Sequence, residues 1–155
     1  MAECLKYEKR LDELTLADYQ KWSADVSKGY LKSAQLLTIQ NILSYRDLPY
    51  RTQITPLAAV LAEIGNKAES EAVRTKIYRW YWCGVLGELY GSAIESRFAR
   101  DYTELIEWIQ GGPEPTTIRD ANFVPDRLLT LKTRNSAAYK GISSLLMRDK
   151  ALDFI

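Results

Sequence analysis

Residue types that carry enzyme chemistry are sparse in this chain, whose 155 residues include no histidine. Histidine is the commonest general base and a frequent metal ligand, because its pKa lies close to physiological pH. Glu88 and Glu95 stand about two helical turns apart, but Gly91 and Ser92 interrupt the helical pattern between them. Glu95 also suits a helix-capping role. We therefore rank a histidine-free hydrolase, using carboxylates or lysine, last among three hypotheses of function.

Sequence motifs for other kinds of catalysis are absent as well. Ser92 lies outside any Gly-x-Ser-x-Gly elbow, and no Gly-x-x-x-x-Gly-Lys phosphate loop occurs. Gly111 and Gly112 end a helix, whereas a phosphate site would need to begin one. The two cysteines, Cys4 and Cys83, are too far apart in sequence to show a metal-binding spacing. The sequence thus predicts no catalytic residue, no metal site and no cofactor, and it indicates no small-molecule substrate.

The distribution of charge is more informative than its net value of +1. From residue 85 to 118 six carboxylates stand against two arginines, whereas from 119 to 150 seven basic residues stand against three aspartates. A basic segment can follow a phosphate backbone, and a helix beginning after Asn135 would add N–H donors. The candidate nucleic-acid-binding residues are Arg127, Lys132, Arg134, Asn135 and Lys140. The alternative is that these cations form a solvated face or pair with the acidic segment of the same chain.

The sequence gives no sign of a membrane partner. No apolar run approaches the roughly 18–20 residues that span a bilayer. The charged start, Met-Ala-Glu-Cys-Leu-Lys, lacks the apolar core of a secretory signal. With only two cysteines, a reduced compartment is the default. We therefore expect a cytoplasmic protein.

Apolar residues recur at helical spacing through most of the chain, and no convincing period-two segment appears. The pattern predicts an all-α fold, a multi-helix bundle of about six to eight helices with short loops. A long helical stretch over 16–43 follows a capping box formed by Thr15 and Asp18. A shorter helix begins at Thr55 and Pro56 and ends at Gly65.

The second half of the bundle centres on an aromatic helix predicted over 71–90. Its rings must be buried or matched to a partner, because side chains of this size dominate cores and interfaces. Two glycines, Gly84 and Gly87, each cost about 1 kcal/mol in a helix interior, so we expect a close contact there. Whether Trp80 and Trp82 face the core or a missing partner stays open.

Caps and prolines divide the remaining residues into short helices. One capping box, Ser92 to Glu95, predicts a helix through residue 99, and a second, Asp101 to Glu104, predicts another through 109. A short helix is expected at 125–129, after which Asn135 and Ser136 cap a last helix. The apolar face of that last helix consists of Ala138, Ile142, Leu145 and Leu146.

Five motifs, in this order and spacing, resemble the central helical part of the large GmrSD-like family, whose members are related to modification-dependent restriction enzymes. The motifs are LPYRTQITPLAA (48–59), RWYWCG (79–84), YGSAIESRFA (90–99), WIQGGPEP (108–115) and TRNSAAYKG (133–141). The resemblance runs from about residue 14 to 154.

The resemblance implies catalytic domains outside this chain. Full-length members carry an N-terminal ParB-like nucleotide-hydrolysing domain with an Asp-Gly-Gln-Gln-Arg type motif, and many end in a histidine-dependent nuclease of the His-Me finger class. This sequence has neither feature, so no catalytic residue of the family maps onto it. We expect residues 1–155 to form a single helical domain within a larger prokaryotic DNA-targeting defence protein. Its partners would be the other domains of that protein, which it would scaffold. The alternative function is a nucleic-acid-binding module that contacts DNA through the basic 119–150 segment.

Overall fold

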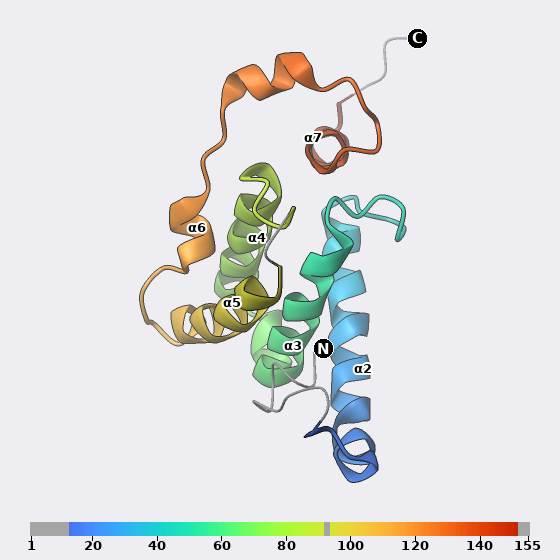
Figure 1. Ribbon diagram of the computed structural model, residues 1–155, viewed down its shortest axis with the longest axis vertical. Helices are drawn as coiled ribbons and strands as arrows, with labels where there is room; N and C mark the ends of the chain where they lie inside the picture. The colour runs from blue at the N-terminus through green and yellow to red at the C-terminus, as the bar shows by residue number, and fades with distance from the viewer. Residues whose placement is uncertain (1–12, 92–93, 152–155) are drawn as a thin grey trace.

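The computed structural model describes residues 13–91 and 94–151, and these residues form helices and no strand (Figure 1). The expected all-α fold is confirmed. In chain order the elements are α2 (Leu16–Ile39), η2 (Arg51–Gln53), α3 (Ile54–Ile64), η3 (Gly65–Glu69), α4 (Glu71–Leu86), α5 (Ile94–Ile109), α6 (Thr116–Asp120), η4 (Pro125–Thr130) and α7 (Ala137–Arg148), where η marks a 3-10 helix.

Helices α2 and α3 pack side by side along much of their length (Figure 1). The predicted capping box is present, with the Thr15 hydroxyl accepting a hydrogen bond from the Asp18 backbone N–H. Gly29 lets the two backbones approach, since an added Cβ would lie 2.2 Å from the Ala58 carbonyl oxygen. α2 ends at Ile39, earlier than predicted, because the chain turns at Asn41, whose φ is 59°.

The aromatic helix α4 supplies the centre of the core. Trp80, Tyr81 and Trp82 are all buried, which answers the question that the sequence left open. At Gly84 an added Cβ would lie 2.5 Å from the Gln53 side-chain nitrogen, so the expected close contact is present. α4 ends at Leu86, earlier than predicted, with Gly87 as its C-cap.

Helix α5 is continuous, which corrects the prediction of two helices at this position. Asp101 is not a cap: its buried carboxylate accepts hydrogen bonds from the hydroxyls of Tyr90 and Thr117. Glu104 instead accepts hydrogen bonds from the backbone N–H and hydroxyl of Thr116, at 2.5 and 2.7 Å, and so satisfies the start of α6. The side chains of Ser92 and Glu95, the other predicted box, lie outside the described residues.

Residues 121–136, which we call the strap, lead from α6 past the end of α4 to α7 (Figure 1). The predicted short helix at Pro125 is present as η4, and Ser136 caps α7 by accepting a hydrogen bond from the Tyr139 N–H. α7 packs on α4, where Gly141 faces Val85 and Trp82. One predicted member of its apolar face, Leu146, is instead 54% exposed.

Candidate functional site

The loop between α2 and η2 is shaped by local hydrogen bonds and one apolar anchor. The Asp47 carboxylate accepts hydrogen bonds from the backbone N–H and hydroxyl of Ser44, at 2.9 and 2.8 Å. Leu48 is buried in the core, and Pro49 prevents the loop from continuing as a helix. The loop therefore holds Arg46 on one side of the Leu48 anchor and Tyr50 on the other.

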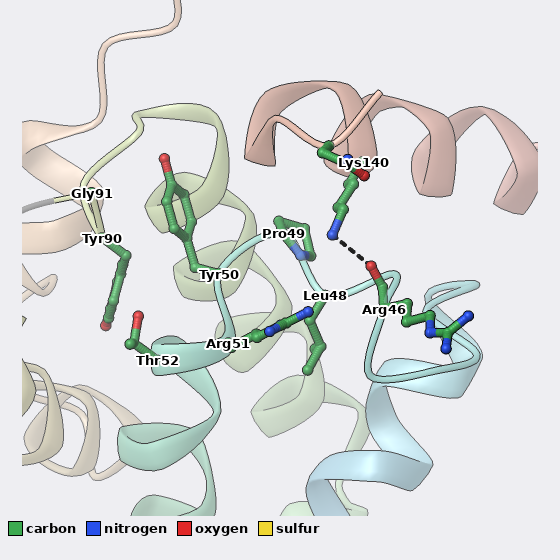
Figure 2. A pocket seen from close by; sticks show the side chains of 10 residues that line it. Arg46, Leu48, Pro49, Tyr50, Arg51, Thr52, Tyr90, Gly91 and Lys140 are labelled. Atoms are coloured by element: carbon green, nitrogen blue, oxygen red, sulfur yellow. Dashed lines mark hydrogen bonds between the residues drawn. The ribbon is translucent and has the colours of Figure 1, made fainter. Parts of the chain in front are cut away.

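An open hollow of about 660 Å³ is bordered by this loop, the N-terminal half of α7 and the turn after α4 (Figure 2). The Lys140 ammonium donates a hydrogen bond to the Arg46 carbonyl oxygen at 2.5 Å, tying α7 to the loop. The hollow is lined by Arg46, Leu48, Pro49, Tyr50, Arg51, Thr52, Tyr90, Gly91, Asn135 and Lys140.

A second hollow of about 290 Å³ lies against α7 and shares Arg46, Asn135 and Lys140 with the first. Its other lining residues are Asp47, Arg134, Tyr139, Ser143, Ser144 and Met147. We call the two hollows together the basic cleft.

Positive charge dominates the basic cleft. Arg46, Arg51 and Lys140 line the larger hollow, and none of the described residues lining it is acidic. Arg134 adds a fourth cation in the smaller hollow, where the one carboxylate is Asp47 of the Ser44 turn. The cleft thus has four cationic side chains and one carboxylate, so at least three positive charges are available to bind an anion.

Aromatic rings form one wall of the larger hollow. The half-buried Tyr50 ring lies 6.3 Å, centroid to centroid, from the fully buried ring of Tyr90. Tyr90 in turn packs against Trp80 edge-on at 6.4 Å and stacks on Phe98 at 6.1 Å. Tyr50 is thus the outermost ring of a rigid aromatic cluster that extends into the core.

Burial sets the protonation of both tyrosines. Burial raises the pKa of Tyr90 well above its usual value, and the Asp101 carboxylate, which accepts a hydrogen bond from the Tyr90 hydroxyl, adds to the increase. Burial likewise raises the pKa of Tyr50, with a further contribution from the negative charge of Glu88. Both hydroxyls stay protonated near neutral pH, so the ring wall carries no charge.

The structure brings together three of the five residues predicted to bind nucleic acid. Arg134, Asn135 and Lys140 all line the basic cleft, whereas Lys132 is exposed on the strap outside it. Arg127 pairs with Glu88 at 3.0 Å, the contact between basic and acidic segments that the alternative hypothesis anticipated. Whether any of the five contacts nucleic acid stays a prediction.

Sequence patterns missed two cations of the cleft, Arg46 and Arg51. Arg46 follows the last apolar residues of the α2 pattern, and the Arg51 guanidinium lies over the Tyr45 ring at 4.4 Å. The Tyr45–Arg51 spacing around Pro49 signals a structured turn. Nothing in it signals that α7 lies opposite.

Other candidate groups from the sequence take structural places or lie outside the described residues. Glu88 is engaged by Arg127, whereas Cys4 and Ser92 belong to the residues that the structure does not describe. Burial raises the pKa of the Cys83 thiol, which makes it a weaker nucleophile at neutral pH. Within 13–91 and 94–151, no group of three or more Cys, Asp or Glu side chains is placed to hold a metal ion.

No protein-family model matches the chain, and no solved structure matches it. The chain is similar to an uncharacterized protein of Methanocaldococcus jannaschii, with 29% identity over 84 residues. The match covers 51% of this chain and 14% of that relative, so the chain spans a small part of the relative's length. Among the described residues, no helix has both the length and the apolar character to cross a bilayer.

Proposed function

We propose that this chain is a non-catalytic helical module that binds nucleic acid through the basic cleft, within a larger DNA-targeting protein. The observation that carries the proposal is the convergence of cations from distant segments. Arg46 and Arg51 come from the loop before α3, and Arg134 and Lys140 come from the start of α7. Solvation alone gives no reason for like charges from distant segments to gather around one concave surface.

The types of residue in the basic cleft favour a nucleic acid over other anions. Guanidinium groups match phosphate oxygens with paired N–H donors, and the positive dipole end of α7, which begins at Ala137, adds to their charge. Tyr50 and Tyr45 add aromatic faces beside these cations, a combination typical of surfaces that bind both bases and backbone. The net charge of +1 means that attraction comes from this surface and not from the whole molecule.

The resemblance to GmrSD-like proteins supports the wider role. The motif segments 48–59, 90–99 and 133–141 supply every lining residue of the larger hollow except Arg46. In the proposed parent protein, catalysis belongs to domains outside this chain, and the module contributes rigid geometry and a contact to DNA. The packing of α5 against both α3 and α4, around the aromatic cluster, suits a module of this kind.

The salt dependence of DNA binding tests the proposal. We expect the 155-residue chain to bind a short duplex. The logarithm of its association constant should fall steeply as the logarithm of the salt concentration rises. Each lost phosphate contact lowers the slope by about 0.9. Arg134→Ala combined with Lys140→Ala is therefore expected to lower the slope by up to about 1.8, as is Arg46→Ala combined with Arg51→Ala.

A matched control removes two lysines at a distance from the basic cleft. Lys28 is exposed on α2, and Lys67 is exposed in η3 at the far end of α3 from the cleft. Lys28→Ala combined with Lys67→Ala makes the same change in net charge and is expected to leave the slope unchanged. The proposal would be contradicted if the cleft and control pairs changed the salt slope equally, or if the unsubstituted 155-residue chain did not bind DNA.

A further inference from the structure

The larger hollow of the basic cleft has the dimensions of a small-molecule pocket. Its volume of about 660 Å³ falls inside the range of about 300–1,000 Å³ typical of pockets that enclose a ligand. A DNA duplex cannot enter a hollow of this size, although its backbone can pass across the mouth. A single nucleotide that has left the base stack can enter.

The wall of this hollow is suited to a base, and its rim is suited to a phosphate. In Figure 2 the Tyr50 ring stands up from the loop, with Tyr90 and Gly91 to one side and α7 with Lys140 to the other. Tyr50 is backed by Tyr90, Trp80 and Phe98, so a base can stack on it without reorganisation of the core.

Polar groups around the ring complete the requirements of a nucleotide. Lys140 and Arg51 lie on the side of the hollow toward α7 and the loop, where they can take a phosphate. The amide of Asn135 and the hydroxyl of Thr52 are placed in the same lining and can donate to or accept from a base edge. No described residue of this lining is acidic, so no carboxylate within the lining opposes a phosphate there.

We propose that the larger hollow receives one unpaired nucleotide of a bound DNA strand, with its base stacked on Tyr50 and its phosphate held by Lys140 and Arg51. This inference rests on the proposed function and adds the form of DNA that is bound. Unstacking a base is easiest where it is unpaired, so the module selects bulged or mismatched positions over a regular duplex.

The test compares two DNA probes and a free nucleotide. One probe is a paired duplex, and the other is the same duplex with one extrahelical 2-aminopurine nucleotide. We expect the bulged probe to bind about 5- to 150-fold more tightly, the range for one base–aromatic stack. Its 2-aminopurine fluorescence should fall on binding, because the base stacks on Tyr50. Deoxyadenosine 5′-monophosphate should compete only weakly, since it lacks the flanking phosphates.

Variants at Tyr50 separate stacking from charge. Tyr50→Ala and Tyr50→Leu are expected to abolish the preference for the bulged probe, so that each variant binds the paired and the bulged probe with equal affinity. Tyr50→Leu keeps an apolar side chain against Tyr90, so it reports on stacking if the alanine variant fails to fold. Tyr50→Phe retains the ring and should retain the preference.

The possible failures are distinguishable. Equal binding of paired and bulged probes, with no effect of Tyr50→Leu, would overturn this inference while the proposed DNA binding stood. Competition by the free mononucleotide at the affinity of the bulged probe would also overturn it, since the occupant would then be a free nucleotide. Loss of binding to every DNA probe would overturn the proposed function itself.

Discussion

At the scale of single residues, Tyr81 shows a conflict between ring packing and hydrogen bonding. Its ring meets Trp82 edge-on at 5.3 Å, but its hydroxyl is buried without a hydrogen-bond partner among the described residues. Burying an unpartnered hydroxyl costs about 1–3 kcal/mol. Burial also raises the pKa of Tyr81 far above its usual value.

Tyr81→Phe is therefore expected to preserve or raise the free energy of unfolding at pH 7, by up to about 2 kcal/mol. Above pH 10 the advantage of the variant should widen. There the unfolded wild type releases the Tyr81 proton while the folded state keeps it, so wild-type stability falls as pH rises. Urea unfolding at pH 7 and pH 10.5 measures both effects. Tyr19→Phe, at a 59% exposed position, is the control and should change the stability at pH 7 little. Destabilisation by Tyr81→Phe would show that the Tyr81 hydroxyl has a hydrogen-bond partner.

Gly29 illustrates a residue whose size, not its flexibility, is required. The Cβ of an alanine there would lie 2.2 Å from the Ala58 carbonyl oxygen, and the backbone of α3 cannot move away as a flexible side chain would. We expect Gly29→Ala to lower the free energy of unfolding by about 1–3 kcal/mol, despite the better helix propensity of alanine. Urea unfolding checks this value. Ser27→Ala, on the exposed side of α2, is the control, and an equally stable Gly29→Ala would mean that α2 and α3 can separate at no cost.

At the scale of elements, local signals predicted several helix ends correctly, but α3 begins at Ile54, whereas Thr55 and Pro56 predicted its start. Thr15 with Asp18, Gly65 and Ser136 all act at the helix ends that their sequence context indicated. The prediction of two helices in place of α5 was wrong, because Asp101 and Glu104 match a capping pattern but bond instead to Tyr90 and to Thr116 of α6. Capping and long-range hydrogen bonding use the same side chains, so sequence spacing alone could not separate them.

The buried Asp101 should make the packing of α5 depend on pH. Burial raises the pKa of Asp101, although hydrogen bonds from Thr117 and Tyr90 oppose the increase. Between the usual aspartate pKa of about 3.9 and the raised value, the folded state holds more protons than the unfolded state, so stability falls as pH rises through that window. Asp101→Asn cannot titrate. We expect the stability of wild type relative to this variant to be greatest at the acidic end and to decrease as pH rises.

Urea unfolding of wild type and Asp101→Asn at several pH values between 4 and 8 measures this difference. The asparagine amide can still accept a hydrogen bond from one of the two hydroxyls through its oxygen and donate one to the other through its NH₂ group, so the variant should fold. Parallel stability curves would show that the carboxylate keeps the same pKa in both states.

At the scale of the whole molecule, the sequence predicted only part of the candidate site. Three residues of the basic cleft came from the charge pattern of 119–150, because they lie together in sequence. Arg46 is 94 positions from Lys140, and their contact exists only because α4 carries α7 to the loop before α3. Packing decides this proximity, and hydrophobic periodicity carries no information on it.

The same long-range packing predicts that Glu88 restrains DNA binding. It accepts hydrogen bonds from two nitrogens of Arg127, both side chains are about two-fifths exposed, and its charge acts on Tyr50. Glu88→Gln should free Arg127 and tighten binding to a duplex by up to about fivefold, since an exposed ion pair is worth about 0–1 kcal/mol. The salt slope should rise by up to about 0.9.

A double-mutant cycle completes this test. Arg127→Ala alone is expected to change duplex binding little, because Glu88 already neutralises that guanidinium. Adding it to Glu88→Gln should remove most of the gain, since the freed guanidinium is then absent. If Arg127→Ala weakens wild-type binding as much as Arg134→Ala does, the ion pair opens in the complex. Arg127 then contacts DNA directly, as the charge pattern of the sequence predicts, and the strap forms part of the binding surface.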